Sequence, residues 1–317
     1  MALVIAHQYG ASLAASVAAG LPPGVTFRSL GDNAETAWQI PDDAEVLLIN
    51  QDSAVVGLHK GMAAPAGWPF KLQWVHLRST GIDKYPAWIF DVPRVTVTRG
   101  GYAVPIAEYV LAAMLGFAKQ MPQIWGRAPA DWRQHKLDSL QQRTLGIIGF
   151  GEIGKAIAQR AMPFGMTVIG TRRSAGPSGM DGVAMVPLTE LLQRSDHIVV
   201  CTPLTPETRG LLDRDALASI KPGAHLINVG RGPVIDTEAL RGALDTTLGG
   251  ATLDVTDPEP PPEGHWLYQH PKVRLSPHIS GNSPQTRTRI NAFFFDNLAR
   301  YRQGQDLLGL VDKAMPY

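Results

Sequence analysis

A glycine-rich segment near the middle of the chain has the spacing of a phosphate-binding loop. Gly149, Gly151 and Gly154 fit the pattern G-x-G-x-x-G, between an apolar run that predicts a strand and a stretch that predicts a helix. The first glycine permits a tight turn, the second lets the backbone approach a pyrophosphate, and the third lets helix and strand pack closely. The free N–H groups at the helix start suit phosphate oxygens. The segment therefore predicts a dinucleotide-binding site.

A second phosphate-binding pattern overlaps the first. Gly149, Gly154 and Lys155 also match the beginning of a P-loop, G-x-x-x-x-G-K. Ala156 stands where that loop requires a hydroxyl side chain to ligate Mg²⁺. The missing hydroxyl and the additional glycine favour the dinucleotide interpretation, and Lys155 is then expected to be a solvated helix residue.

The end of the next predicted strand bears on which dinucleotide binds. NAD-binding units usually carry an acidic residue about 20 positions after the glycines, where it accepts a hydrogen bond from the ribose 2′-hydroxyl. This chain instead has Thr171, Arg172, Arg173 and Ser174. A charge-assisted contact between arginine and phosphate is worth about 1.5–3 kcal/mol. The segment predicts a preference for NADP(H), with NAD(H) possible; the alternative is two solvated surface arginines.

Three further segments place an arginine, a carboxylate and a histidine after predicted strands. Arg231, Glu259 and His278 each follow a short apolar run. Because the carboxyl ends of parallel strands line the ligand crevice of a doubly wound sheet, we expect these side chains to lie near one another. A ketone that gains hydride develops negative charge on its oxygen, which a guanidinium and an imidazolium can stabilise and protonate. The set predicts reduction of a 2-keto acid.

In these motifs the chain resembles the D-isomer-specific 2-hydroxyacid dehydrogenase family. The resemblance extends from about Leu72 to His278, and within the family the chain is similar to the shorter glyoxylate and hydroxypyruvate reductases. The motifs that carry it are Ser79-Thr-Gly-Ile-Asp83, Ala107-Glu108, the glycine pattern, Pro203-Leu-Thr-Pro-Glu-Thr-Arg209, Asn228 with Arg231-Gly, Asp254-Val with Glu259-Pro, and Pro277-His278.

The resemblance implies a role for each residue of the set. Arg231 would bind the substrate carboxylate and carbonyl oxygen, His278 would be the acid/base, and Glu259 would hydrogen-bond this histidine. The backbone of Thr80 and Gly81 would hold the substrate carboxylate. The residues expected to contact the cofactor are Gly149, Phe150, Gly151, Glu152, Ile153, Gly154, Thr171, Arg172, Arg173, Ser174, Thr202, Pro203, Thr208, Val229, Gly230, Asp254 and Gly281.

Two roles within this set are left open by the sequence. Asp254 is expected either to reach the nicotinamide side of the cofactor or only to satisfy nearby backbone groups. Trp125 and Trp132 precede the glycine pattern, and either one reaches a partner subunit's active site or both anchor a core or interface. His265 and His270 do not meet a metal-ligand spacing, so no metal site is expected.

The order of apolar runs predicts the elements that carry these residues. Short Val- and Ile-rich runs alternate with helical patterns, which is typical of doubly wound α/β folds with parallel sheets. The runs are too many for one open sheet, so two sheets are expected. Strands are predicted at 3–6, 46–49, 72–77, 95–98, 145–148, 168–170, 198–201, 226–229, 252–255 and 273–275, and helices at 11–19, 105–118, 151–164, 188–193, 214–220, 237–244 and 285–301.

The family resemblance also implies how these elements divide into domains. Residues 1–98 and 286–317 would form a split substrate domain, and residues 99–285 an inserted NAD(P)-binding domain, both Rossmann-like or flavodoxin-like, with a cleft between them. The helix predicted at 285–301 is expected to return to the first domain. A homodimer formed through the cofactor domain is also implied.

Composition narrows the class of protein. The chain has 317 residues with 29 Lys+Arg against 28 Asp+Glu, a net charge of +1 that argues against a dedicated nucleic-acid binder. Its one cysteine, Cys201, excludes an intrachain disulfide. No apolar run approaches the roughly 18 residues of a membrane helix, and the N-terminus lacks the pattern of a signal peptide. A cytoplasmic protein is expected, with a small 2-keto or 2-hydroxy acid as its partner and neither nucleic acid nor membrane.

The leading hypothesis is NADPH-dependent reduction of a small 2-keto acid, such as glyoxylate or hydroxypyruvate, to the D-2-hydroxy acid. One alternative is another reaction of the same family, such as oxidation of formate or phosphite. A second alternative, from a different class, is a non-catalytic regulator that senses NAD(P)H on the same fold. His265-Trp-Leu-Tyr268 departs from the usual family sequence Pro-Leu-Trp, so the wall near Glu259 is expected to differ.

Overall fold

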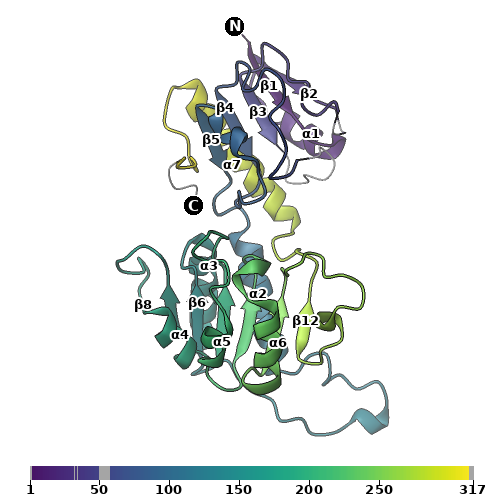
Figure 1. Cartoon of the computed structure of the whole chain (residues 1–317), viewed down its shortest axis with the longest axis vertical. Coiled ribbons are helices and arrows are strands. Elements are labelled where there is room, and N and C mark those ends of the chain that lie inside the picture. Colours follow the sequence, from purple (N-terminus) through teal and green to yellow (C-terminus); the bar gives the residue numbers. More distant parts are fainter. Residues whose placement is uncertain (1, 32, 34, 50–57, 314–317) are drawn as a thin grey trace. The chain divides into compact units, whose positions relative to one another are not determined.

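The computed structural model describes residues 2–31, 33, 35–49 and 58–313. These residues fold into two compact units, drawn in Figure 1. The first unit is Met1–Gly101 with Pro284–Tyr317, and the second is Tyr102–Ser283. The second unit is thus inserted into the first along the chain. Assignment of substrate to one unit and cofactor to the other stays a prediction.

The first unit contains a five-stranded parallel sheet in the order β2-β1-β3-β4-β5. Side chains of a strand point alternately to its two faces, so Leu47 and Ile49 join one core while Val46 and Leu48 join the other. Helix α7 packs on the second of these faces through Phe294, as expected. The elements are β1 (Leu3–His7), α1 (Ala11–Ala18), β2 (Val25–Ser29), β3 (Val46–Ile49), β4 (Trp74–Leu77), β5 (Arg94–Val97) and α7 (Pro284–Arg302).

The second unit contains a seven-stranded parallel sheet in the order β12-β11-β10-β9-β6-β7-β8. The chain starts at β6, runs outward to β8, returns to β9 on the other side of β6, and runs outward to β12. The order of the strands therefore reverses between β6 and β9, where open α/β sheets bind their ligands. The strands are β6 (Thr144–Ile148), β7 (Thr167–Thr171), β8 (Val183–Met185), β9 (His197–Val200), β10 (His225–Asn228), β11 (Gly250–Leu253) and β12 (Val273–Leu275).

Five helices accompany this second sheet: α2 (Ala103–Ala118), α3 (Glu152–Ala161), α4 (Leu188–Arg194), α5 (Arg214–Ala218) and α6 (Thr237–Thr246). The helix predicted at 151–164 ends earlier, at Ala161, and continues as one 3-10 turn, Met162–Phe164. Pro163 lies in that turn, and Gly165 ends it with a φ of +73°. A proline that cannot donate to the helix and a left-handed glycine explain the early end.

The prediction of two parallel sheets is confirmed, and two strands were missed. Both of them, β2 and β8, lie at the edge of a sheet. In β2 the residues are half-buried or exposed, and β8 is only three residues long. The continuous apolar run that marks a buried parallel strand is therefore absent from both.

A long connector, residues 119–143, joins α2 to β6, and we call it the arm. It is irregular apart from the turn Pro129–Asp131, and Figure 1 shows it extending away from the rest of its unit. The arm exposes two aromatic side chains, Trp125 at 64% and Trp132 at 94%. In the described part of the chain, no helix combines the length and apolar character needed to cross a membrane.

Candidate active site

The three glycines of the G-x-G-x-x-G pattern differ in how much space surrounds them. Gly149 has a φ of +98°, and a Cβ there would lie 2.7 Å from the Thr202 backbone nitrogen. At Gly154 a Cβ would lie 3.0 Å from the Gly149 carbonyl oxygen, where α3 crosses the end of β6. At Gly151 an added Cβ would meet no described atom within 4 Å. The first and third glycines allow close packing, and the second leaves open space in front of the helix.

The start of α3 offers backbone donors to that open space. Gly151 is the N-cap residue, and the first α-helical hydrogen bond runs from the Lys155 N–H to the Gly151 carbonyl. The N–H groups of Glu152, Ile153 and Gly154 thus precede the helical ladder, as at any helix start. Open space and a row of N–H donors at a positive helix end fit the pyrophosphate of a dinucleotide.

The side chains of this first turn point elsewhere. Phe150 is 1% exposed and packs in the core of its unit, so only its backbone is available to a cofactor. Glu152 forms an ion pair with Lys155 at 3.2 Å on the exposed surface of the helix. Lys155 is therefore a solvated helix residue, as the dinucleotide interpretation expects.

Arg172 follows β7 directly and is fixed by backbone oxygens. Its Nε donates to the Ser174 carbonyl at 3.2 Å, and its Nη2 donates to the Pro177 carbonyl at 2.7 Å. Thr171, the last residue of β7, accepts hydrogen bonds through its carbonyl from the N–H groups of Gly149 and Phe150. The glycine loop and the Arg172 segment are thus joined directly.

Arg173 is exposed, and its charge acts on Glu207. The pKa of Glu207 is lowered, first by a hydrogen bond with the Thr205 side chain and, to a smaller extent, by the charge of Arg173. The same loop is closed by Thr208, whose hydroxyl donates to the Pro203 carbonyl at 2.7 Å and accepts from the Thr205 N–H.

The loops after β6, β9 and β10 meet where the strand order reverses. The Thr202 backbone lies against Gly149, and a Cβ at Gly230 would lie 2.8 Å from the Thr202 carbonyl oxygen. The Cys201 thiol donates to the Gly149 carbonyl at 3.1 Å, and burial raises its pKa to about 12. Val229 is buried at 7% exposure, so its side chain faces the core. Cys201 is accordingly an inert packing residue.

A buried asparagine shapes the loop that presents Arg231. Asn228 is 1% exposed; its Oδ1 accepts from the Gly230 N–H and its Nδ2 donates to the Arg231 carbonyl, both at 3.0 Å. A Cβ at Gly232 would lie 1.9 Å from the Thr256 carbonyl oxygen, so no larger residue fits there. In the sequence, Asn228 is part of a motif and has no assigned role. The signal that could have indicated one is a polar residue at the end of a buried strand, two positions before a glycine.

Glu259 and His278 form a hydrogen-bonded pair. Their Oε1 and Nδ1 atoms are 2.9 Å apart, and about a third of each side chain is exposed. An ionised carboxylate only accepts hydrogen bonds, so Nδ1 of His278 carries the proton in this pair. The other ring nitrogen, Nε2, is then the atom directed to chemistry. His278 has a φ of +55°, a left-handed conformation that is uncommon for a residue with a side chain.

Asp254 holds the backbone around His278. It is 1% exposed, and its carboxylate accepts from the N–H groups of Ile279 and Ser280 at 2.9 and 3.0 Å. Its main-chain carbonyl accepts from the His278 N–H at 2.9 Å. Of the two roles left open, satisfaction of nearby backbone groups is the one with contacts in the structure. Gly281 follows closely, and a Cβ there would lie 2.9 Å from the Tyr102 ring.

Thr80 and Gly81 belong to the first unit and lie three and four residues after Leu77, the end of β4. The Thr80 hydroxyl donates to the Thr98 carbonyl at 2.6 Å, and Thr98 directly follows β5. The Thr80 and Gly81 backbone therefore lies at the carboxyl edge of the sheet. The predicted catalytic residues, Arg231, Glu259 and His278, belong to the second unit.

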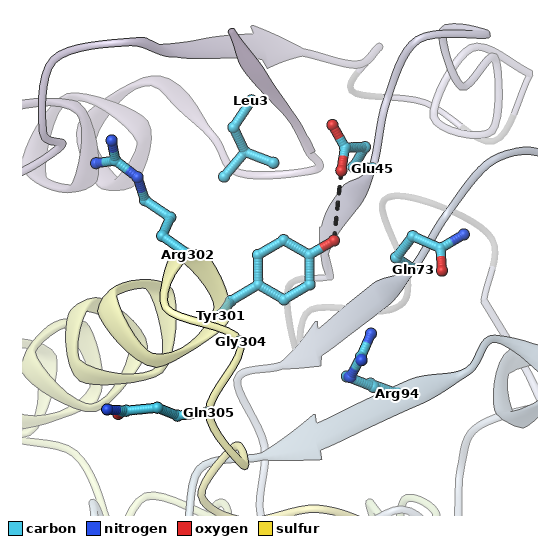
Figure 2. Close-up of a pocket in the computed structure, with 8 residues that line it drawn as sticks. All are labelled: Leu3, Glu45, Gln73, Arg94, Tyr301, Arg302, Gly304 and Gln305. Atoms are coloured by element: carbon cyan, nitrogen blue, oxygen red, sulfur yellow. Dashed lines mark hydrogen bonds between the residues drawn. The ribbon is translucent and has the colours of Figure 1, made fainter. Parts of the chain in front are cut away.

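The opposite edge of the first sheet carries a polar pocket of about 450 Å³. Figure 2 shows Glu45, Gln73 and Arg94, which lie at the amino ends of β3, β4 and β5, around Tyr301 of α7. The Tyr301 hydroxyl lies 3.5 Å from Glu45 Oε2. None of the residues lining this pocket belongs to the predicted site, which follows the carboxyl ends of strands. Among the described residues, no group of three or more His, Cys, Asp or Glu is placed to hold a metal ion.

Comparison with known proteins identifies the family of the chain. The family model "D-isomer specific 2-hydroxyacid dehydrogenase, NAD binding domain" matches residues 111–280, more than half of the chain. The chain therefore belongs to the D-isomer specific 2-hydroxyacid dehydrogenases, a family of NAD(P)-dependent oxidoreductases that act on CH–OH groups.

Among its relatives, the D-3-phosphoglycerate dehydrogenase of Homo sapiens is 32% identical over 250 residues, which is 76% of this chain and 47% of that protein. The chain thus spans about half the length of this relative. The glyoxylate/hydroxypyruvate reductase B of Pectobacterium carotovorum is 38% identical over 63% of this chain and 66% of its own length. The crystal structure of the D-isomer specific 2-hydroxyacid dehydrogenase from Xanthobacter autotrophicus, in complex with NADPH and MES, has a TM-score of 0.82 at 28% identity and covers all of both chains.

Proposed function

We propose that this protein reduces a small 2-keto acid, such as glyoxylate or hydroxypyruvate, to the D-2-hydroxy acid with NADPH. The observation that carries the proposal is the Glu259–His278 pair, with Nδ1 and Oε1 2.9 Å apart, in the same unit as the glycine loop. A histidine whose Nδ1 is occupied by a carboxylate presents Nε2 as a positioned acid/base.

In this proposal His278 and Arg231 act on the keto group. A reduced dinucleotide held at the start of α3 would supply the hydride for the carbonyl carbon. As negative charge develops on the carbonyl oxygen, the Arg231 guanidinium stabilises it and His278 Nε2 delivers a proton, which gives the hydroxyl of the product. Glu259 accepts from Nδ1, so it fixes the orientation of the ring and the nitrogen that faces the substrate. The backbone N–H groups of Thr80 and Gly81 hold the substrate carboxylate, as in the family motif.

The preference for NADPH is assigned to Arg172 and Arg173. Contacts to the Ser174 and Pro177 carbonyls orient the Arg172 guanidinium before any ligand binds, and such preorganisation lowers the entropic cost of binding a 2′-phosphate. Arg173 adds a second positive charge, part of which Glu207 offsets. The Xanthobacter relative, crystallised with NADPH, supports the same choice.

The proposal includes a cytoplasmic homodimer formed through the arm. Trp125 and Trp132, 64% and 94% exposed, and Leu137 at 43% are large apolar side chains that a partner subunit could cover. Sedimentation of wild type and of a Trp125→Ser/Trp132→Ser variant checks this: we expect a dimer for the former and a larger monomer fraction for the latter. A monomeric wild type would remove this part of the proposal.

The experiment that tests the function follows loss of reduced-nicotinamide absorbance. Purified protein is mixed with NADPH or NADH and with glyoxylate, hydroxypyruvate, pyruvate or phenylpyruvate, and the product is resolved by chiral chromatography. We expect faster loss with NADPH and one of the small acids, and a D product. D-3-phosphoglycerate, formate and phosphite are tested in the oxidative direction with NADP⁺ and NAD⁺.

Each other outcome has a defined meaning. Faster loss of absorbance with NADH than with NADPH would support the reductase activity and refute the assignment of Arg172 and Arg173 to the 2′-phosphate. Turnover only in an oxidative assay would refute the proposed substrate and identify the oxidised compound as the substrate instead. NADPH binding without turnover of any of these compounds contradicts the proposal in favour of a non-catalytic regulator.

A further inference from the structure

A tyrosine on α2 joins the hydrogen-bond system that holds the His278 loop. The Tyr109 hydroxyl lies 2.7 Å from Ser276 Oγ, and Ser276 Oγ donates to Asp254 Oδ1 at 2.5 Å. The three residues come from three separate elements: α2, the end of β12 and the end of β11. All three belong to the same unit as His278.

The direction of the first hydrogen bond follows from proton counting. A serine hydroxyl has a single proton, and that of Ser276 is given to Asp254. Ser276 can therefore only accept from Tyr109, so the tyrosine is the first donor of this hydrogen-bonded series. Burial raises the pKa of Tyr109, the hydrogen bond with Ser276 opposes this rise, and the charge of Asp254 adds to it. The phenol thus keeps the proton that it donates.

Asp254 is where this series of hydrogen bonds reaches the histidine. Its two carboxylate oxygens accept the N–H groups of Ile279 and Ser280, and its carbonyl accepts the His278 N–H. Left-handed backbone in a residue with a side chain persists only where the surroundings over-determine it. For His278, these hydrogen bonds to Asp254 supply that constraint.

The hydroxyl of Tyr109 is not required to hold α2 in place. Helix α2 is packed by fully buried residues on either side of this position, Ala107 and Val110, both at 0% exposure. Phenylalanine would keep the packing of the ring. The phenolic oxygen therefore contributes through Ser276 and little else.

We propose that Tyr109 is a positioning residue for His278. Its hydroxyl fixes the Ser276 hydroxyl toward Asp254, Asp254 fixes the backbone of residues 278–280, and that backbone aims the imidazole of His278. This inference rests on the proposed function of His278 as the proton donor. It adds a residue 169 positions away in sequence, for which the sequence alone indicated no role.

The test is a set of conservative variants assayed with saturating NADPH and the best keto acid. For Tyr109→Phe we expect kcat to fall about tenfold, with less than about a twofold change in the KM for the keto acid and in the Kd for NADPH. Tyr301→Phe is the matched control, because it removes a phenol that donates to Glu45 in the other unit. Ser276→Ala should lose activity, and Ser276→Thr, which keeps the hydroxyl, should retain it.

A double-mutant cycle separates this role from a merely structural one. Because Tyr109 acts through Ser276, Tyr109→Phe in the Ser276→Ala background should cause no further loss. Additive losses would overturn the proposal, as would an unchanged kcat in Tyr109→Phe or an equal loss in Tyr301→Phe.

An NMR measurement decides the inference even if no substrate is turned over. The imidazole ¹⁵N resonances of His278, assigned with His278→Gln, should shift in Tyr109→Phe and stay in place in Tyr301→Phe. An inactive wild type would refute the proposed function alone, whereas unshifted His278 resonances would refute the positioning role of Tyr109.

Discussion

The charge on Glu259 should contribute to turnover by a predictable amount. In the variant Glu259→Gln, the new amide oxygen can still accept from Nδ1 of His278, so the 2.9 Å contact can persist without its charge. A hydrogen bond to a charged group is worth about 1.5–3 kcal/mol and a neutral one about 0.5–1.5 kcal/mol, a difference of about 1 kcal/mol. Since about a third of each side chain is exposed, solvent screening reduces this figure.

One kcal/mol corresponds to somewhat less than a tenfold change in rate, because about 1.4 kcal/mol is tenfold. We therefore expect Glu259→Gln to lower kcat about three- to fivefold. Glu259→Ala also frees the ring, so the loss should approach the lower end of the roughly 10²–10⁴ range for a positioned acid/base. His278→Ala should fall within that range. NADPH affinity should be unchanged in all three variants, because the glycine loop is a separate element.

The assay is steady-state oxidation of NADPH at saturating keto acid, with NADPH Kd measured by tryptophan fluorescence. Glu263→Gln is the matched control, since Glu263 is an exposed glutamate in the same proline-rich loop. Wild-type turnover in Glu259→Ala would show that the carboxylate has no part in proton delivery. An equal loss in Glu263→Gln would show that the loop, and not the contact to His278, is being measured.

The other predictions concern the cofactor loop, its specificity and acid stability. Gly149→Ala should abolish NADPH binding and lower Tm, because a Cβ would lie 2.7 Å from a backbone nitrogen at a φ of +98°; Gly242→Ala, where a Cβ meets no described atom within 4 Å, is the control by calorimetry. Arg172→Ala should lower the ratio of kcat/KM for NADPH over NADH about tenfold or more, and an unchanged ratio would contradict the 2′-phosphate assignment. Burial lowers the pKa of His197 to about 4 from an ordinary value of 6.5, so the unfolded chain binds a proton that the folded chain does not. The free energy of unfolding should therefore decrease as pH falls from about 6.5 to about 4, and His197→Gln should flatten this slope in urea titrations.

Local sequence was sufficient for the buried strands and for the glycine loop. Strands such as β3 and β9 are buried along their whole length, so an apolar run marks them, and their bounds agree with the prediction to within about one residue. The edge strands β2 and β8 were not predicted. The residues of β2 are half-buried or exposed and so form no apolar run, and β8, with three residues, is too short to show a pattern. The roles of Gly149, Gly151 and Gly154 follow from spacing since a tight turn and a helix start are local events.

The position of residues after predicted strands did not predict the contacts within the candidate site. Their position after predicted strands singled out Arg231, Glu259 and His278, but the hydrogen bond between the last two joins residues 19 apart across a proline-rich loop. From the sequence, Asn228 had no role beyond its place in a motif. In the structure its amide hydrogen-bonds the backbone of Gly230 and of Arg231.

By itself, then, the sequence of this protein determined which residue types arrive at the carboxyl ends of its strands, because β-strand burial and glycine conformation are encoded within a few neighbouring residues. Only the tertiary structure decided what those residues contact. From the sequence, Asp254 could contact either the cofactor or nearby backbone groups. The structure shows its carboxylate accepting hydrogen bonds from the N–H groups of Ile279 and Ser280. Tyr109 and Ser276 are 167 residues apart, and no periodicity relates a hydroxyl on a helix to one beyond a strand; their contact exists because separate elements pack around one core.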